Sequence, residues 1–182
     1  MASIAVIAGS PSAPSRSTAV LRYLCQLIES AGQTVELMEL RDLPAGGLLK
    51  GDVSLPPMQH AHALVAGAAG IIVGTPVYKA TYSGLLKTFF DYLPESSLRG
   101  KSVYPVATGG SPAHMLAIDY GLKPVLSVMG ASHILQGVYV SDQTMTIRDD
   151  GRIAFDAEIE DRLQRGLDDL LADVNRRVPA AQ

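Results

Sequence analysis

The residues best suited to bind an anion lie in the segment GSPSAPSRST, residues 9 to 18, which we name the serine turn. It contains four serines, one threonine and Arg16, and it separates an apolar run from a helical pattern. Free backbone N–H groups at a helix start attract negative charge, hydroxyls donate to phosphate oxygens, and an arginine can donate two hydrogen bonds. The turn has no G-K-[ST] ending, no G-x-G-x-x-G pattern and no lysine for a γ-phosphate. We therefore expect it to bind one terminal phosphate, the alternative being an ordinary N-cap in a Ser/Pro-rich turn.

The segment TPVYKATYSG, residues 75 to 84, is named the tyrosine turn and directly follows an apolar run. Pro76 stops the strand because it has no backbone N–H, and Tyr78 offers a broad face and a hydroxyl. Ser83 followed by Gly84 is able to begin the next helix. We therefore expect this turn to line a ligand site. The alternative is a buried aromatic turn that only caps the sheet.

The segment ATGGSPAH, residues 107 to 114, is named the glycine turn and ends the next apolar run. Its two glycines let the backbone approach a flat ligand at low steric cost. Residues 109–113 also approximate the strand-to-helix turn that carries a hydrolase nucleophile, with His114 nearby. That chemistry requires the residue after the nucleophile to donate a backbone N–H, and Pro112 has none. A hydrolase is therefore disfavoured.

The three turns follow the first, third and fourth strands of a predicted parallel sheet. Short apolar runs alternate with helical patterns, which is typical of a sheet covered by helices on both faces. The predicted strands are residues 3–8, 34–40, 70–74, 102–107 and 133–140. The favoured strand order is 2-1-3-4-5, in which ligands bind at the carboxyl ends near the switch between the first and third strands. The sequence thus predicts one α/β domain over residues 1–182, with all three turns at one edge.

Helical spacing of apolar residues predicts the covering helices. They lie between the first two strands, at 56–68, from 85 to Pro94, and at the C-terminal end with Asp156 as the N-cap. Residues 42–57 are expected to form a long loop. Residues 141–155, which contain the RDDGR turn, are expected to form a short hairpin or an extension of the fifth strand.

The segment HMLAIDYGLKPVL interrupts its own helical pattern. Pro124 cannot donate to the carbonyl of Tyr120, and Gly121 weakens the helix beside it. A kink or a single π-turn is therefore predicted near Tyr120.

The composition argues against several function classes. The chain has 182 residues, 47% of them hydrophobic, and a net charge of -3 without a block of lysine or arginine. We therefore expect neither nucleic acid nor an anionic membrane as a partner. The apolar stretches are shorter than the roughly 20 residues needed to span a bilayer, and the N-terminus lacks signal-peptide features, so a cytoplasmic location is expected.

The single cysteine and the four histidines form no predicted catalytic or metal site. Cys25 lies within a helical pattern without a neighbouring histidine, so we expect a core or boundary residue. It cannot form an internal disulfide, which agrees with a reducing compartment. His60 and His62 would lie on different faces of a helix, and the other two histidines are isolated in the sequence.

Taken together, the three turns resemble those of the NADPH-dependent FMN reductases of the flavodoxin-like superfamily. The matching segments are AGSPSAPSRST (8–18), TPVYKATYSGLLKTFFDYLPE (75–95), ATGGSPAHMLAIDYGLKPVL (107–126) and the strand ILQGVY. The resemblance is close to the reductases of two-component alkanesulfonate monooxygenase systems and covers almost the whole domain. It implies a flavodoxin-like three-layer sandwich.

The resemblance also implies binding residues. The first turn binds the FMN phosphate in that family, which points to Ser10, Arg16, Ser17 and Thr18. The tyrosine turn holds the isoalloxazine ring, and the glycine turn faces the other edge of the ring. The residues implied for the ring are Pro76, Val77, Tyr78, Lys79, Thr108, Gly109, Gly110 and Ser111. We also expect Lys79 near the phosphates of the flavin or the nicotinamide, and Tyr82 only to pack.

The implied reaction is hydride transfer from NADPH or NADH to FMN, without a catalytic side chain. Reduced FMN would then leave for a partner flavin-dependent monooxygenase in sulfur assimilation. The family's π-helical tyrosine at a tetramer interface matches Tyr120, so a homo-oligomer, either a dimer or a tetramer, is implied.

Two alternatives remain open at this point. One is a quinone, azo-dye or chromate reductase with bound FMN, and the other is a flavodoxin-like electron carrier. The mild net charge and Arg16 count against the carrier, because flavodoxins are usually strongly acidic and bind the phosphate mainly with hydroxyls and amides.

Overall fold

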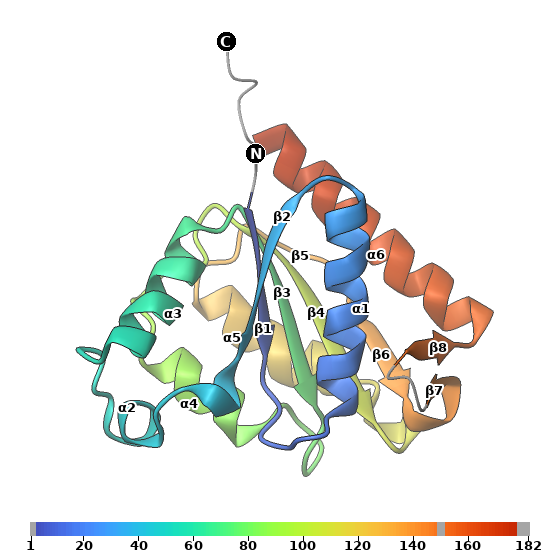
Figure 1. Cartoon of the computed structure of the whole chain (residues 1–182), viewed down its shortest axis with the longest axis horizontal. Coiled ribbons are helices and arrows are strands. Elements are labelled where there is room, and N and C mark those ends of the chain that lie inside the picture. The colour runs from blue at the N-terminus through green and yellow to red at the C-terminus, as the bar shows by residue number, and fades with distance from the viewer. Residues whose placement is uncertain (1–2, 149–151, 178–182) are drawn as a thin grey trace.

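The protein is built around a parallel β-sheet that lies between two layers of helices (Figure 1). The computed structural model describes residues 3–148 and 152–177. The strands of the sheet are β1 (Ser3–Ala8), β2 (Thr34–Glu39), β3 (Gly70–Pro76), β4 (Ser102–Gly109), β5 (His133–Ile134) and β6 (Val138–Ser141). Their order is β2-β1-β3-β4-β5, β6 also pairs with β4, and these pairings are parallel. The predicted order 2-1-3-4-5 is confirmed.

Helices cover both faces of the sheet, as predicted. The α-helices are α1 (Arg16–Ser30), α2 (Ala45–Lys50), α3 (Pro56–Gly67), α4 (Gly84–Asp91), α5 (Lys123–Val128) and α6 (Ala157–Arg177). Helices α1 and α6 pack on one face, and α3, α4 and α5 pack on the other (Figure 1). Helix α6 begins directly after Asp156, whereas α4 ends at Asp91, before the predicted Pro94.

Strand β1 shows how the sequence produces two cores. Successive side chains of a strand point to opposite faces. Ile4 and Val6 therefore join the cluster under α1 and α6, while Ala5 and Ile7 join the cluster under α3, α4 and α5. The sheet is buried on both faces, which explains why its strands are continuous apolar runs.

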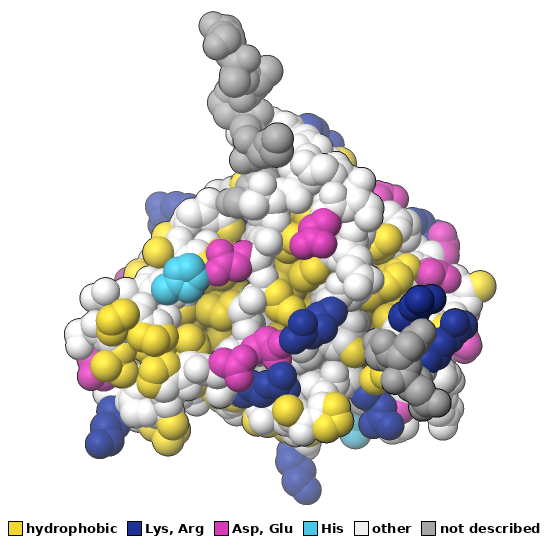
Figure 2. All heavy atoms as spheres, in the orientation of Figure 1, with side chains coloured by type: hydrophobic (Ala, Val, Ile, Leu, Met, Phe, Trp, Pro, Cys, Tyr) yellow, Lys and Arg dark blue, Asp and Glu magenta, His cyan; other side chains and the backbone are white. Residues whose placement is uncertain are grey.

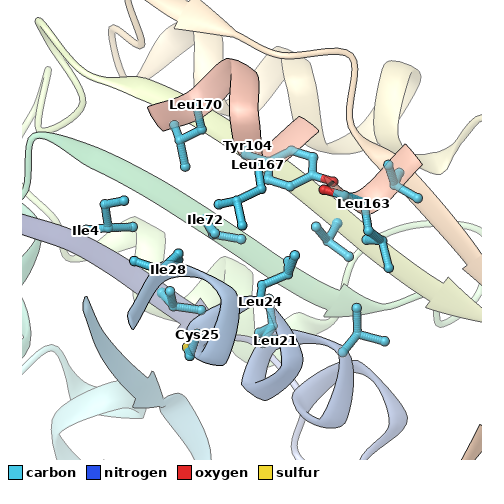
Figure 3. Close-up of a cluster of buried hydrophobic side chains, with 14 of the residues drawn as sticks. Ile4, Leu21, Leu24, Cys25, Ile28, Ile72, Tyr104, Leu163, Leu167 and Leu170 are labelled. Atoms are coloured by element: carbon cyan, nitrogen blue, oxygen red, sulfur yellow. Dashed lines mark hydrogen bonds between the residues drawn. The ribbon is translucent and has the colours of Figure 1, made fainter. Parts of the chain in front are cut away.

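Figure 3 shows the first cluster, in which leucines of α1 and α6 meet the sheet from the same side. Cys25 lies in this cluster and is buried, as predicted. Burial raises the pKa of its thiol to about 11, so it is a protonated core residue at neutral pH.

The fifth strand differs from the prediction because it is broken into β5 and β6. Leu135 N donates to Val103 O across the pairing (2.9 Å), so residues 103 and 105 of β4 direct their backbone groups toward the fifth strand. Pro105 has no N–H to offer there, and the ladder is interrupted opposite it. Gly137 adopts a φ of 81° at the break, where a Cβ atom would lie 2.7 Å from Pro105 O.

Two irregular segments contain more structure than a loop. Helix α2 lies where residues 42–57 were predicted to be a long loop, so that prediction is wrong in part, and a 3-10 turn, η1 (Leu40–Asp42), leads into this segment from β2. Leu48 of α2 is only 4% exposed, and its burial outweighs the poor helix propensity of the two glycines beside it. The expected hairpin within 141–155 is confirmed as the antiparallel pair β7 (Met145–Ile147) and β8 (Ile153–Phe155), while residues 149–151 of the RDDGR turn lie outside the described residues.

The surface carries mixed charges on the face drawn in Figure 2, where basic and acidic side chains are interspersed. The hydrophobic side chains on the left of this view lie over α2, where Leu49 is 75% exposed. Among the described residues, no helix is both long enough and apolar enough to cross a membrane.

Candidate functional site

The carboxyl edge of the sheet brings the three turns together. Gly9 N donates to Gly74 O (2.8 Å) and Val77 N donates to Thr108 O (2.8 Å), so the serine turn is tied to β3 and the tyrosine turn to β4. Between them lies a cavity of about 280 Å³. Its lining residues are Ser10, Ser12, Pro14, Ser15, Arg16, Ser17, Pro76, Val77, Tyr78, Thr108, Gly109, Gly110 and Asp142. The turns predicted to meet do form one cavity.

The serine turn presents the start of α1 to this cavity. Ser15 is the N-cap: its Oγ accepts from Thr18 N (3.2 Å) and lies 3.0 Å from Ser17 Oγ. Arg16 and Ser17 are the first two helical residues, so their backbone N–H groups have no acceptor within the helix. The dipole of α1 adds positive potential at the same point. This end of the cavity therefore has the donors that an anion requires.

A set of buried contacts fixes the serine turn against its neighbours. Ser83, the N-cap of α4, accepts from Leu86 N (3.1 Å) and donates through its Oγ to Gly9 O. Thr75 Oγ1 accepts from Ser83 N (2.9 Å), which joins the start of α4 to the end of β3. Ser83 begins α4, as predicted, and also holds the serine turn.

Arg41 supports the same turn from the end of β2. Its guanidinium donates to Ser12 O and pairs with Glu39, which also pairs with Arg22 of α1. Arg41 therefore fixes the carbonyl of Ser12, a residue that lines the cavity.

The tyrosine turn is tight and has an unusual backbone. Tyr78 N donates to Thr81 O (2.9 Å) and Thr81 N donates to Tyr78 O (3.2 Å), with Lys79 and Ala80 between them at φ values of 51° and 68°. Left-handed backbone at non-glycine residues costs free energy and is most often retained near functional sites. The turn places Tyr78 at the rim, 45% exposed, with its hydroxyl 3.4 Å from Ser12 Oγ. Tyr82 packs against the core, as predicted.

Tyr139 of β6 holds the glycine turn, and the sequence argument missed it. Its buried hydroxyl donates to Ser111 O (2.7 Å), and burial raises the pKa of Tyr139, so it remains a neutral donor. A Cβ atom on Gly109 would lie 2.5 Å from this hydroxyl. Gly109 is therefore required to leave room for the side chain that positions the turn.

Asp142 is a second residue that the sequence argument missed. It follows β6 at the start of the 3-10 turn η4 (Asp142–Thr144), and its Oδ2 lies 3.2 Å from Arg16 Nη1. Its position after the carboxyl end of the last strand was the available signal, because ligands of such sheets bind at that edge.

Most of the predicted site residues share the cavity. Those lining it are Ser10, Arg16, Ser17, Pro76, Val77, Tyr78, Thr108, Gly109 and Gly110. Three predicted residues do not line it. Thr18 is buried with its N–H bonded to Ser15, Lys79 is exposed at the tip of the tyrosine turn, and Ser111 is the N-cap of the 3-10 turn η2 (Pro112–His114). Their roles in binding stay predictions.

The predicted π-turn is confirmed as a π-helix, η3 (Ile118–Leu122), which leads directly into α5. Tyr120 lies at its centre and is 80% exposed. Met115 and Leu116 are also more than half exposed. Gly121 lies against Thr81, so this apolar surface adjoins the tyrosine turn.

Comparison with known proteins identifies the family. The family model described as "NADPH-dependent FMN reductase" matches residues 2–146. An FMN reductase (NADPH) of Pseudomonas putida is 45% identical over 172 residues, covering 94% of this chain and 87% of the relative. An FMN reductase (NADPH) of Escherichia coli is 40% identical over 174 residues, covering 96% and 91%.

Solved structures agree with the sequence matches. An NADH:FMN oxidoreductase, EMOB in apo form, superimposes with a TM-score of 0.86 at 37% identity, covering 93% of this chain and 88% of that chain. Flavodoxin 1 of Bacillus cereus superimposes with a TM-score of 0.62 at 18% identity, covering 98% and 99%, which shows the flavodoxin-like fold alone. On these matches, the chain belongs to the NADPH-dependent FMN reductase family and is an oxidoreductase that uses NAD(P)H and FMN.

Proposed function

We propose that the cavity at the carboxyl edge is the FMN site, where the flavin is reduced by NADPH before it passes to a flavin-dependent monooxygenase. The observation that carries this proposal is the meeting of an anion-binding helix start with two turns suited to a flat ring. No other described cavity combines these features: the others lie at α6, at the α4–α5 groove and beside Tyr120.

The phosphate of FMN fits the serine turn. Several donors lie at this end of the cavity. They are the free N–H groups of Arg16 and Ser17 and the hydroxyls of Ser10, Ser12 and Ser15. Arg16 adds a cation able to donate two hydrogen bonds to one phosphate. A monophosphate suits this set better than a pyrophosphate or triphosphate, because the turn supplies no lysine beyond it.

The ring of FMN fits between the tyrosine and glycine turns. Val77 and Tyr78 provide apolar surface for the ring, and Gly109 and Gly110 bring backbone close to its other edge. The bond from Val77 N to Thr108 O fixes the spacing of the two walls. A spacing set before the ligand arrives lowers the entropy cost of binding.

FMN supplies the hydride-accepting chemistry when bound. The residues of this chain bind the phosphate, orient the ring and keep one ring face free for the nicotinamide. Arg16 and Asp142 are the charged residues among those that line the cavity, and both lie at its phosphate end. We therefore assign no catalytic acid or base.

The shallow rim supports FMN as a substrate that dissociates. Tyr78 is 45% exposed, and the cavity is near the lower limit of ligand pockets, which run from about 300 Å³. A flavin held this openly is able to leave after reduction. The partner monooxygenase and its place in sulfur assimilation rest on the family resemblance, and the proposed cytoplasmic location rests on the short apolar stretches and the N-terminal sequence.

We also propose that the chain forms a dimer or a tetramer through the surface of Met115, Leu116 and Tyr120. Large exposed apolar side chains in one patch are typical of interaction sites. The π-helix supports this use, since it presents Tyr120 to solvent rather than to the core.

The test is a steady-state assay of the purified protein with FMN and either NADPH or NADH. Nicotinamide absorbance should fall only when FMN is present, and the ratio of the two rates gives the coenzyme preference. No FMN-dependent oxidation with either coenzyme would refute the proposal. Gel filtration after mixing with FMN separates the alternatives: FMN that stays bound during turnover favours a quinone, azo-dye or chromate reductase, and tight binding without turnover favours an electron carrier.

A further inference from the structure

Asp142 stands where the serine turn and the glycine turn approach each other. Strand β6 pairs with β4 so that Ser141 lies opposite Gly109, and Asp142 follows at once. Its Oδ2 lies 3.2 Å from Arg16 Nη1 and 3.6 Å from the position of a Cβ atom on Gly110. The carboxylate thus reaches the arginine that is proposed to bind the flavin phosphate.

The phosphate end of the cavity carries one positive and one negative side chain. Among the described residues that line the cavity, Arg16 is the cation and Asp142 is the anion. The Asp142 carboxylate pairs with the Arg16 guanidinium through Nη1. A phosphate entering the same end needs those donors and meets a negative charge beside them.

We propose that Asp142 competes with the flavin phosphate for Arg16 and thereby weakens FMN binding, which makes it an affinity-setting residue for a flavin that must leave. This inference rests on the proposed function, since it requires FMN in the cavity. The Arg16 side chain is 60% exposed and that of Asp142 is 30% exposed, so water screens the pair and the arginine is able to turn from one anion to the other. The expected effect is about two- to fivefold in affinity, the scale of a solvent-exposed ion pair.

The experiment measures dissociation constants of FMN and riboflavin by quenching of flavin fluorescence. Riboflavin lacks the phosphate, so it reports on the ring site alone. The variants are Asp142→Asn, Asp142→Ser and Arg16→Ala, together with the double variant Arg16→Ala/Asp142→Asn. The matched control is Asp161→Asn, because Asp161 pairs with Arg165 on α6 at 2.6 Å, and neither residue lines the cavity.

The proposal predicts that Asp142→Asn and Asp142→Ser tighten FMN binding and slow its release while riboflavin binding is unchanged. The gain should shrink at high salt and vanish in the Arg16→Ala background, and Asp161→Asn should have no effect. Unchanged or weaker FMN binding in both Asp142 variants would overturn the inference, as would an equal gain for riboflavin. Failure of the wild type to bind FMN would instead refute the proposed function itself.

Discussion

Removing the hydroxyl of Tyr139 is expected to loosen the glycine turn. In Tyr139→Phe, Ser111 O loses the donor that lies 2.7 Å away in the wild type. Ser111 is partly exposed, so water is able to replace this donor and the full penalty of a buried unpaired carbonyl does not apply. The expected loss is therefore the net value of one hydrogen bond, about 1 kcal/mol in the free energy of unfolding.

This loss predicts two measurable changes. For a chain of this size, about 1 kcal/mol lowers the unfolding temperature by roughly 2–4 °C. If FMN binds only to the ordered turn, ordering the loosened turn of the variant opposes binding by at most the same free energy, about 1 kcal/mol. The dissociation constant of FMN then rises by at most about fivefold. Calorimetry gives the first value and flavin fluorescence gives the second.

Tyr104→Phe is the matched control for this prediction. Tyr104 is also buried, and its hydroxyl donates to Leu163 O at 3.3 Å, within the core beneath α6 (Figure 3). The control should lower the unfolding temperature by a similar amount and leave FMN binding unchanged. Tyr139→Phe with wild-type FMN affinity would show that the tether to Ser111 does not position the turn for the flavin.

Three further predictions concern separate parts of the molecule. Arg16→Ala should weaken FMN binding by about 1.5–3 kcal/mol, as expected for a charged hydrogen bond, and an unchanged dissociation constant would remove Arg16 from the site. Tyr120→Ala should change the oligomeric state or flavin retention, and identical sedimentation and flavin content would count against the interface. Asp173 accepts from Ser102 and pairs with His133 and Arg176, and these contacts, His133 foremost, lower its pKa from 3.8 to about 2. Because the pKa of Asp173 is lower in the folded state, its ionised carboxylate stabilises the fold above pH 3.8, and this stabilisation is lost toward pH 2. The unfolding temperatures of the wild type and of Asp173→Asn should therefore converge between pH 3.8 and pH 2. A difference between the two temperatures that stays constant over this range would contradict the prediction.

The sheet could be predicted from the sequence because each strand is marked by a short segment of adjacent residues. Each buried strand is a short apolar run, and the alternation of strands with helices leaves few possible windings. The π-helix was also predictable, since Pro124 removes a donor at a defined distance from Tyr120. By contrast, the break between β5 and β6 depends on Pro105 in a different strand, and α2 depends on the burial of Leu48 against distant residues.

The candidate site was predictable to the extent that its residues lie in the turns themselves. Each turn is a short continuous segment of the sequence, and the three turns meet because their strands are neighbours in the sheet. This explains why the sequence pointed to Ser10, Arg16, Tyr78 and the two glycines. Tyr139 and Asp142 were not predicted because each acts on a residue of another segment, Ser111 and Arg16, and the fold alone brings these residues together. For Asp142 the sequence offers only its position after the last strand, and for Tyr139 the partner is a backbone carbonyl, which every residue carries.

A crystal structure of the protein with FMN would show whether the flavin binds in the cavity formed by the three turns. We expect the phosphate at the N–H groups of Arg16 and Ser17, and the ring at the turns of Val77–Tyr78 and Gly109–Gly110. A flavin bound in any other described cavity, or one with its phosphate away from the serine turn, would refute the proposed FMN site.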